Sequence, residues 1–377
     1  MQLANQLINS AIPNPLTHIS ADYESGHIFN NYLRGCKWSP DGTCLLTSSN
    51  DKCMRIFELD LILDSSFDST SSSAALVLYE PEIVYDYAWY PAMCSEAPLT
   101  CCLVTTSRDC PVHLWDAYTG SVRCSYLPYD HVQELHAPYS VCFSADGDYI
   151  ICGMKHYLKV FHTAIPGSYS TNIQLVLGKK HIPNNIVSTV TTRGSAILFG
   201  SFGGNVGLVG ETGKIELLLE AHTQGVTHID VTADGNYVVA GGRKNNNIFI
   251  WDLRNTTQFV AKLNRISLTS QKIYFDIDKS NSIVSGNQDG NISVWSEYTW
   301  KSHRENLNGI SPDSQILAHK DSVNGISVHP SRGLIASASG ERKFWVDFDL
   351  EYGEDEEMST VSSENCIKIW NNFNRFI

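Results

Sequence analysis

The chain has 377 residues, with 27 lysines and arginines against 40 aspartates and glutamates, so its formal net charge is −13. A hydrophobic content of 42% supplies enough apolar surface for a substantial core and excludes a disordered chain. No run approaches the ~18 consecutive apolar residues of a membrane-spanning helix, and no secretory signal is apparent at the first residues. The acidity argues against nonspecific binding of nucleic acid only if the charge is evenly spread.

The first segment, residues 1–29, contains a strand-like stretch from Thr17 to Ser25 and is followed by a repeated unit over residues 30–377. Each unit has an apolar strand, a tight turn that often reads Asp-Gly, a second strand ending in small residues, a polar turn and a third strand. The residues that end the third strands are Phe57, Trp115, Phe161, Val209, Trp251, Trp295 and Trp370. Four of the six steps between them approach the ~40–45 residues of a WD40 propeller blade, and Trp-Asp itself occurs at Trp115 and Trp251.

Two insertions explain the longer steps. One is Ser-rich and covers residues 64–73, and the other is acidic and covers residues 341–364. The acidic run Val346–Glu357 carries seven acids and no base, and without it the charge balance is 27 minus 33, or −6. Such runs are usually solvated, so more than half of the net charge lies in one loop.

These patterns predict an all-β fold, a single seven-bladed WD40 β-propeller. Because few residues follow Trp370, blade seven has no room for its own outer strand. We expect the stretch Thr17–Ser25 to supply it and to close the ring, since closure removes an exposed sheet edge.

Histidines and tryptophans at fixed places in the units are interpreted as structural. His222 and His319 precede units five and seven, where a histidine, a Ser or Thr and the tryptophan commonly share buried hydrogen bonds. The residues interpreted in this way are His222, His319, Trp115, Trp251, Trp295 and Trp370.

Catalytic and metal-binding signatures are absent from the sequence. The 11 cysteines contain no CxxC pair, no histidine pair completes a zinc pattern, and no P-loop, G-x-S-x-G or H-E-x-x-H occurs. Asp41, Asp146 and Asp234 stand in Asp-Gly turns, and turn chemistry explains them. We therefore expect no enzyme, no metal and no cofactor, and buried thiols in a reducing compartment.

The turns between second and third strands gather at one face of a propeller, and five of the seven carry bases. Connections into the first strands reach the same face. The predicted RNA-binding residues are Lys52, Arg108, Lys155, Arg243, Lys244, Arg342, Lys343, Tyr85 and Lys272. Lysine, arginine and aromatic side chains suit single-stranded RNA loops, because phosphates take the charge and bases stack. The alternative is that exposed turns are often charged, and Asp51, Asp109 and Glu341 dilute the signal.

Several stretches resemble the telomerase Cajal body protein family of WD40 scaffolds. They cover roughly residues 30 to 370 and include YLRGCKWSPDGTCLLTSSNDKCMRIFEL, TTSRDCPVHLWDAYTG, AHTQGVTHIDVTADGNYVVAGGRKNNNIFIWDLR, QKIYFDIDKSNSIVSG and NGISVHPSRGLIASASGER. Arg108, Arg243, Lys244 and Arg342 lie within these stretches. The acidic insertion also falls where the family has one.

The resemblance implies a nuclear, non-catalytic scaffold that recognises the CAB-box loop of small Cajal-body RNAs of the H/ACA and C/D types, and telomerase RNA where present. It implies Cajal-body localisation with some cytoplasmic protein, dyskerin-type partners and chaperonin-assisted folding. We expect a monomer with no membrane association.

Two alternatives remain open. The same bases suit a WD40 platform for acidic or phosphorylated peptides, since carboxylates and phosphates pair with Lys and Arg in the same way. The acidic run could also compete with RNA for the basic face, because it adjoins Gly340–Lys343 in sequence.

Overall fold

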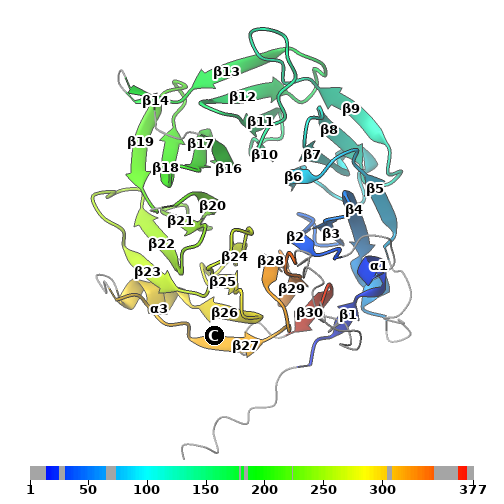
Figure 1. Cartoon of the computed structure of the whole chain (residues 1–377), viewed down its shortest axis with the longest axis vertical. Helices are drawn as coiled ribbons and strands as arrows, with labels where there is room; N and C mark the ends of the chain where they lie inside the picture. The colour runs from blue at the N-terminus through cyan, green and yellow to red at the C-terminus, as the bar shows by residue number, and fades with distance from the viewer. Residues whose placement is uncertain are drawn as a thin grey trace, which may run out of the picture.

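The computed structural model describes residues 14–24, 30–64, 74–177, 180–181, 186–222, 224–303, 308–343 and 364–371. Seven four-stranded antiparallel sheets stand around a central channel (Figure 1), and the predicted all-β seven-bladed propeller is confirmed. The helices of this part are short: α1 (Ala21–Glu24), α2 (Leu59–Ile62), a 3-10 turn (Pro98–Thr100) and α3 (Glu297–Ser302). None of the helices in these ranges is long and apolar enough to cross a membrane.

Each blade runs outward from the channel in strand order. Blade one contains β2 (Leu33–Trp38), β3 (Cys44–Ser49), β4 (Cys53–Glu58) and β5 (Leu76–Tyr79). Blade two contains β6 (Val84–Trp89), β7 (Cys102–Ser107), β8 (Val112–Asp116) and β9 (Val122–Tyr126). Blade three contains β10 (Ser140–Phe143), β11 (Tyr149–Gly153), β12 (Tyr157–His162) and β13 (Ser170–Gln174), and the short pair β14 (Val176–Leu177) and β15 (Lys180–His181) follows it.

The remaining blades repeat this order until the last one. Blade four contains β16 (Val187–Arg193), β17 (Ala196–Ser201), β18 (Asn205–Val209) and β19 (Ile215–Glu220). Blade five contains β20 (Val226–Val231), β21 (Tyr237–Gly242), β22 (Asn247–Asp252) and β23 (Ala261–Asn264). Blade six contains β24 (Phe275–Ile277), β25 (Ile283–Gly286), β26 (Asn291–Trp295) and β27 (Ser314–Leu317). Blade seven contains β28 (Val323–Val328), β29 (Leu334–Ser339), β30 (Ile367–Asn371) and β1 (Thr17–Ile19).

The repeated anchor residues all lie on the third strands, and each is buried between neighbouring blades. The second strands beneath them are almost fully buried, as in β29 and β21. This burial explains why the aromatic spacing in the sequence reveals the blades. The Asp-Gly turns also form as predicted. In one of them Asp234 Oδ1 accepts the backbone N–H of Asn236 at 3.1 Å, and Gly235 has φ +69°.

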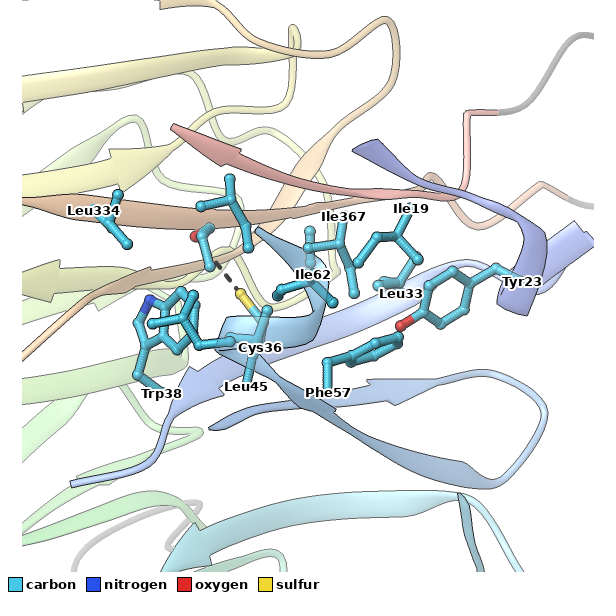
Figure 2. Packing of buried hydrophobic residues seen from close by; sticks show 14 residues of the cluster. Ile19, Tyr23, Leu33, Cys36, Trp38, Leu45, Phe57, Ile62, Leu334 and Ile367 are labelled. Atoms are coloured by element: carbon cyan, nitrogen blue, oxygen red, sulfur yellow. Dashed lines mark hydrogen bonds between the residues drawn. The ribbon is translucent and has the colours of Figure 1, made fainter. Parts of the chain in front are cut away.

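The ring is closed by the N-terminal strand, as predicted. β1 pairs antiparallel with β30, and Thr17 lies opposite Ile369. The strand is shorter than the predicted stretch, because residues Ala21–Glu24 turn into α1 and seat Tyr23 against blade one. Figure 2 shows Ile19 and Tyr23 packed in one apolar cluster between blades seven and one. The Thr17 hydroxyl also donates to the carbonyl oxygen of Ile62 at 2.8 Å.

Most of the two insertions lies outside the described residues. Of the Ser-rich stretch only residue 64 is described, and of the acidic insertion only 341–343 and 364 are described. Residues 1–13 and 25–29 also lie outside the described part. The predicted domain boundaries and the competing role of the acidic run therefore stay predictions.

Blade seven has hydrogen bonds of the kind interpreted as structural. His319 Nε2 lies 2.7 Å from Ser337 Oγ, and Trp370 Nε1 donates to the same oxygen at 2.8 Å. In blade five the equivalent strand position is Ala240, which has no hydroxyl. His222 Nε2 instead contacts the Ala240 carbonyl oxygen at 3.2 Å, and the His222 ring packs edge-on against Phe249.

The other two tryptophans use different partners. Trp115 Nε1 donates to Glu80 and to Thr105, both at 2.9 Å, so an acid stands where blade seven has a histidine. Trp295 Nε1 donates to the carbonyl oxygen of Ile310 at 3.2 Å. The histidine–hydroxyl–tryptophan arrangement expected for both His222 and His319 is thus found in blade seven and not in blade five.

Candidate nucleic-acid interface

One mouth of the central channel opens into a cavity of about 790 Å³, which we call the mouth cavity. It lies on the face formed by the turns between second and third strands and by the connections into the first strands. Its lining residues include Tyr32, Arg34, Ser48, Tyr85, Tyr87, Tyr139, Phe202, Arg243, Gln271, Lys272, Tyr274, Asn324, Glu341 and Arg342. All seven blades, or the connections into them, contribute lining residues, so the cavity belongs to the whole ring.

The mouth cavity is electropositive. Its charged lining consists of four cations, Arg34, Arg243, Lys272 and Arg342, against the single carboxylate of Glu341. Burial lowers the pKa of Lys272, Asp86 opposes this shift, and the cations Lys37, Arg243 and Arg34 add to it. Burial also lowers the pKa of Arg243. An anion bound here would relieve this repulsion, because an opposite charge favours the protonated form.

Aromatic rings lie beside these cations. The rings of Tyr85 and Tyr139 are stacked with centroids 6.0 Å apart and an interplanar angle of 16°. The Arg243 guanidinium lies 4.8 Å from the centroid of the Phe202 ring. Such flat surfaces of rings and guanidinium groups are the platforms on which unpaired bases stack.

Several buried polar atoms of the mouth cavity have no hydrogen-bond partner within the described residues. They are Arg34 Nε, Arg243 Nε, the Tyr87 hydroxyl and Ser48 Oγ. Buried donors normally find a partner, since leaving one unsatisfied costs about 1–3 kcal/mol. All four atoms belong to side chains that line this one cavity.

Four of the nine predicted RNA-binding residues line the mouth cavity: Tyr85, Arg243, Lys272 and Arg342. Two further bases have nearby acids: Lys52 lies 3.1 Å from Glu82, and Arg108 lies 3.3 Å from the neighbouring Asp109.

The last three lie outside the cavity lining. Lys343 Nζ lies 3.3 Å from an Asp321 carboxylate oxygen. Lys155 and Lys244 are exposed. The structure therefore brings four of the nine predicted residues together around the mouth cavity and leaves the other five outside its lining.

Three tyrosines that line the mouth cavity, Tyr87, Tyr139 and Tyr274, are not among the residues predicted from the sequence. Tyr139 precedes β10 much as Tyr85 stands at the start of β6, and this signal could have found it. Tyr87 and Tyr274 face the channel from the first strand of blade two and from just before that of blade six. Their inward direction depends on strand register, which the sequence pattern did not specify.

The opposite end of the channel has the other sign of charge. A second cavity of about 350 Å³ is lined by Asp86, Asp230 and Asp276, together with Lys37, His228 and Lys272, which lines both cavities. Burial raises the pKa of Asp276 to about 7, with a further contribution from Asp230, whose own pKa burial raises to about 6. These carboxylates also join blades, since Asp276 Oδ2 accepts the N–H of Val328 at 2.7 Å. The three carboxyl groups make this cavity a less favourable place for an anion than the mouth cavity.

The model of the WD domain, G-beta repeat, matches residues 20–58 and 213–252, which contain β2 to β4 and β19 to β22. The chain is a WD40-repeat propeller.

Curated relatives are similar to most of this chain. The chain is 39% identical to the "Telomerase Cajal body protein 1" of Mus musculus and 37% identical to that of Homo sapiens, in each case over 83% of this chain. It spans about three fifths of their length, 60% and 58% respectively. The resemblance to the telomerase Cajal body protein family is confirmed. A "Guanine nucleotide-binding protein negative regulator 1" of Schizosaccharomyces pombe is 28% identical over 70% of both chains.

Proposed function

We propose that this protein is a non-catalytic scaffold that binds RNA in the mouth cavity. Its RNAs are small Cajal-body RNAs of the H/ACA and C/D types, recognised by their CAB-box loop, and telomerase RNA where present. The observation that carries the proposal is the convergence of cations, stacked rings and unsatisfied donors on one cavity. The printed names of the relatives, which refer to telomerase and to the Cajal body, support the choice of RNA.

The mouth cavity suits a hairpin loop better than a duplex. A loop can place an unstacked base against Tyr85 and Tyr139 while its phosphates reach Arg243 and Lys272. A duplex offers its phosphates on a broad surface and keeps its bases paired. A duplex would therefore leave the mouth cavity unfilled.

Binding of a CAB-box hairpin tests the proposal. Arg243→Ala and Lys272→Met should each weaken binding about tenfold or more and reduce the salt slope by about one. Lys214→Ala, a charge-matched control in the β18–β19 turn outside the cavity lining, should leave affinity within about twofold. Fluorescence anisotropy over a salt series measures these effects.

The control RNA is the same hairpin with its loop sequence changed. Tighter binding of the CAB-box loop supports sequence recognition, and equal affinity for the two loops contradicts it. If the Lys214 variant is as weak as the Arg243 variant, the mouth cavity is not the binding site.

The assembly and location of the protein follow from this function. We propose association with dyskerin-type ribonucleoprotein components, a place in nuclear Cajal bodies with a cytoplasmic fraction, and assistance by a chaperonin during folding. The propeller acts as a monomer that presents one RNA to its partners.

A protein-binding platform is the second candidate. The name of the Schizosaccharomyces pombe relative refers to regulation of another protein, and the cations of the mouth cavity also suit an acidic or phosphorylated peptide. Partners that survive RNase treatment in a pull-down favour this candidate, and partners lost with the RNA favour the scaffold.

A further inference from the structure

A short segment of blade seven forms part of the wall of the mouth cavity. Residues 340–343, which we call the strap, follow the end of β29 and begin the connection to β30. Glu341 and Arg342 of the strap line the cavity together with Gln271, which belongs to the connection into blade six. The strap pairs with no strand in the part of the chain that the structure describes. Its position, and with it that of Arg342, therefore depends on other contacts.

Side chains of the surrounding connections hold the backbone of the strap. The Gln271 amide makes two hydrogen bonds to it. Its Nε2 donates to the carbonyl oxygen of Gly340 at 3.3 Å, and its Oε1 accepts the N–H of Arg342 at 3.0 Å. Asn30 Nδ2 donates to the carbonyl oxygen of Glu341 at 2.5 Å. Gln271 thus contacts the backbone directly at Arg342 and two residues before it.

The place of the backbone decides which base of the strap reaches the mouth cavity. Arg342 lines the cavity, whereas the next residue, Lys343, lies outside the lining with its Nζ 3.3 Å from Asp321 Oδ2. The strap also lies close against blade one. A Cβ added at Gly340, where φ is +153°, would be 2.7 Å from the Cβ of Tyr32, so only glycine allows this approach.

We propose that Gln271 is a positioning residue for RNA binding, whose amide fixes the backbone of Arg342 so that the guanidinium meets a phosphate in the mouth cavity. This inference rests on the proposed RNA-binding function. An arginine suits the phosphate because its N–H groups can bond two oxygens at once. Ordering a long side chain on binding costs free energy, and a backbone that is already held reduces that cost. Gln271 carries no charge and acts through Arg342.

Two other roles of Gln271 predict different results. Since its side chain lines the cavity, a direct hydrogen bond to a base would weaken binding on removal, but the loss would be independent of Arg342 and of salt. A role in folding alone would lower the melting temperature and leave the affinity for RNA unchanged.

The experiment measures binding of the CAB-box hairpin to the full chain over a salt series. Gln271→Met keeps the length of the side chain and removes both hydrogen bonds to the strap. It should weaken binding about fivefold and reduce the salt slope by up to about one, although it removes no charge. In an Arg342→Ala background the same substitution should change the affinity less than about twofold, because the residue through which it acts is gone.

Two further variants complete the series. Gly340→Ala displaces the strap while Gln271 stays intact, and it should reduce the salt slope in the same way. Gln315→Met, which removes an exposed amide of β27 outside the cavity lining, should match wild type in affinity and slope. Thermal melting of each variant checks that it is folded.

An unchanged salt slope for Gln271→Met overturns the proposal, as does an equal loss of affinity with and without Arg342. Normal binding by Gln271→Met or by Arg342→Ala also overturns it. If Gln271→Met does not fold, the salt slope of Gly340→Ala decides the question. Failure of the proposed function looks different, because Arg243→Ala would then bind the hairpin as tightly as wild type.

Discussion

Buried charges give the two ends of the channel opposite properties. Lys272 is a cation at the mouth cavity, with no acid within ion-pair distance in the described part of the chain, and it lies near the ring of Tyr274. Asp276 is a carboxylate at the other end whose pKa burial raises to about 7. Burial disfavours the charged form of both residues. Lys272 faces a cavity that a ligand can fill, whereas Asp276 accepts a hydrogen bond from Val328 of the neighbouring blade.

The raised pKa of Asp276 makes stability depend on pH. The folded chain keeps this proton up to about pH 7 while the unfolded chain loses it near 3.8, so the contribution is present at low pH and is lost as pH rises toward 7. The melting temperature of Asp276→Asn relative to wild type should therefore rise between pH 5 and 7. The gain is at most ~1.4 kcal/mol per pH unit.

Asp41→Asn is the control for this measurement. Hydrogen bonds from Ser39, Ser95 and Thr43 outweigh burial and lower the pKa of Asp41 to about 2. Its contribution is therefore constant between pH 5 and 7, and its difference from wild type should stay flat. A parallel pH profile for both variants would contradict the proposed ionisation of Asp276.

Among the elements, β1 shows which structural features the sequence predicts and which it does not. The repeat predicts that blade seven needs an outer strand, and the only strand-like stretch before the first unit supplies it. The end of the strand could not be predicted, because Tyr23 is drawn into the apolar cluster of blade one and its hydroxyl bonds Thr47 at 2.8 Å.

The candidate site was predictable in part for a similar reason. Turn positions follow from the repeat, so Arg243 and Arg342 could be placed on the correct face. Which bases enter the cavity depends on side-chain direction and on nearby acids. The Lys52 ammonium, for example, lies 3.1 Å from Glu82 Oε1, and the periodicity of the sequence does not predict this ion pair.

Deletion of residues 1–26 removes β1 and α1 and should sharply lower the melting temperature, because it exposes the edge of β30 and the cluster around Ile19. A deletion of residues 1–13, which keeps both elements, is the matched control. Differential scanning fluorimetry measures both. Equal melting of the two deletions would show that β1 does not close the ring in solution.

At the scale of the whole molecule, the net charge of −13 conceals a basic mouth and an acidic far end of one channel. RNA crosslinked to the protein should therefore be found on peptides of the mouth cavity, such as those with Tyr85, Phe202 and Lys272. Peptides from the β18–β19 and β22–β23 turns should stay unlabelled. Mass spectrometry of the crosslinked peptides tests this, and labelling concentrated on those turns would place the RNA elsewhere.

The pairing of β1 with β30 also has a consequence for synthesis. The ribosome makes Thr17 before the first blade and its partner Ile369 after six blades are complete, so the first strand waits while the strands between them are made. During that time the growing ring has open edges and an apolar flank on blade one, and such edges invite contact with other chains. The nascent propeller has to be shielded until β30 has been made and can pair with β1.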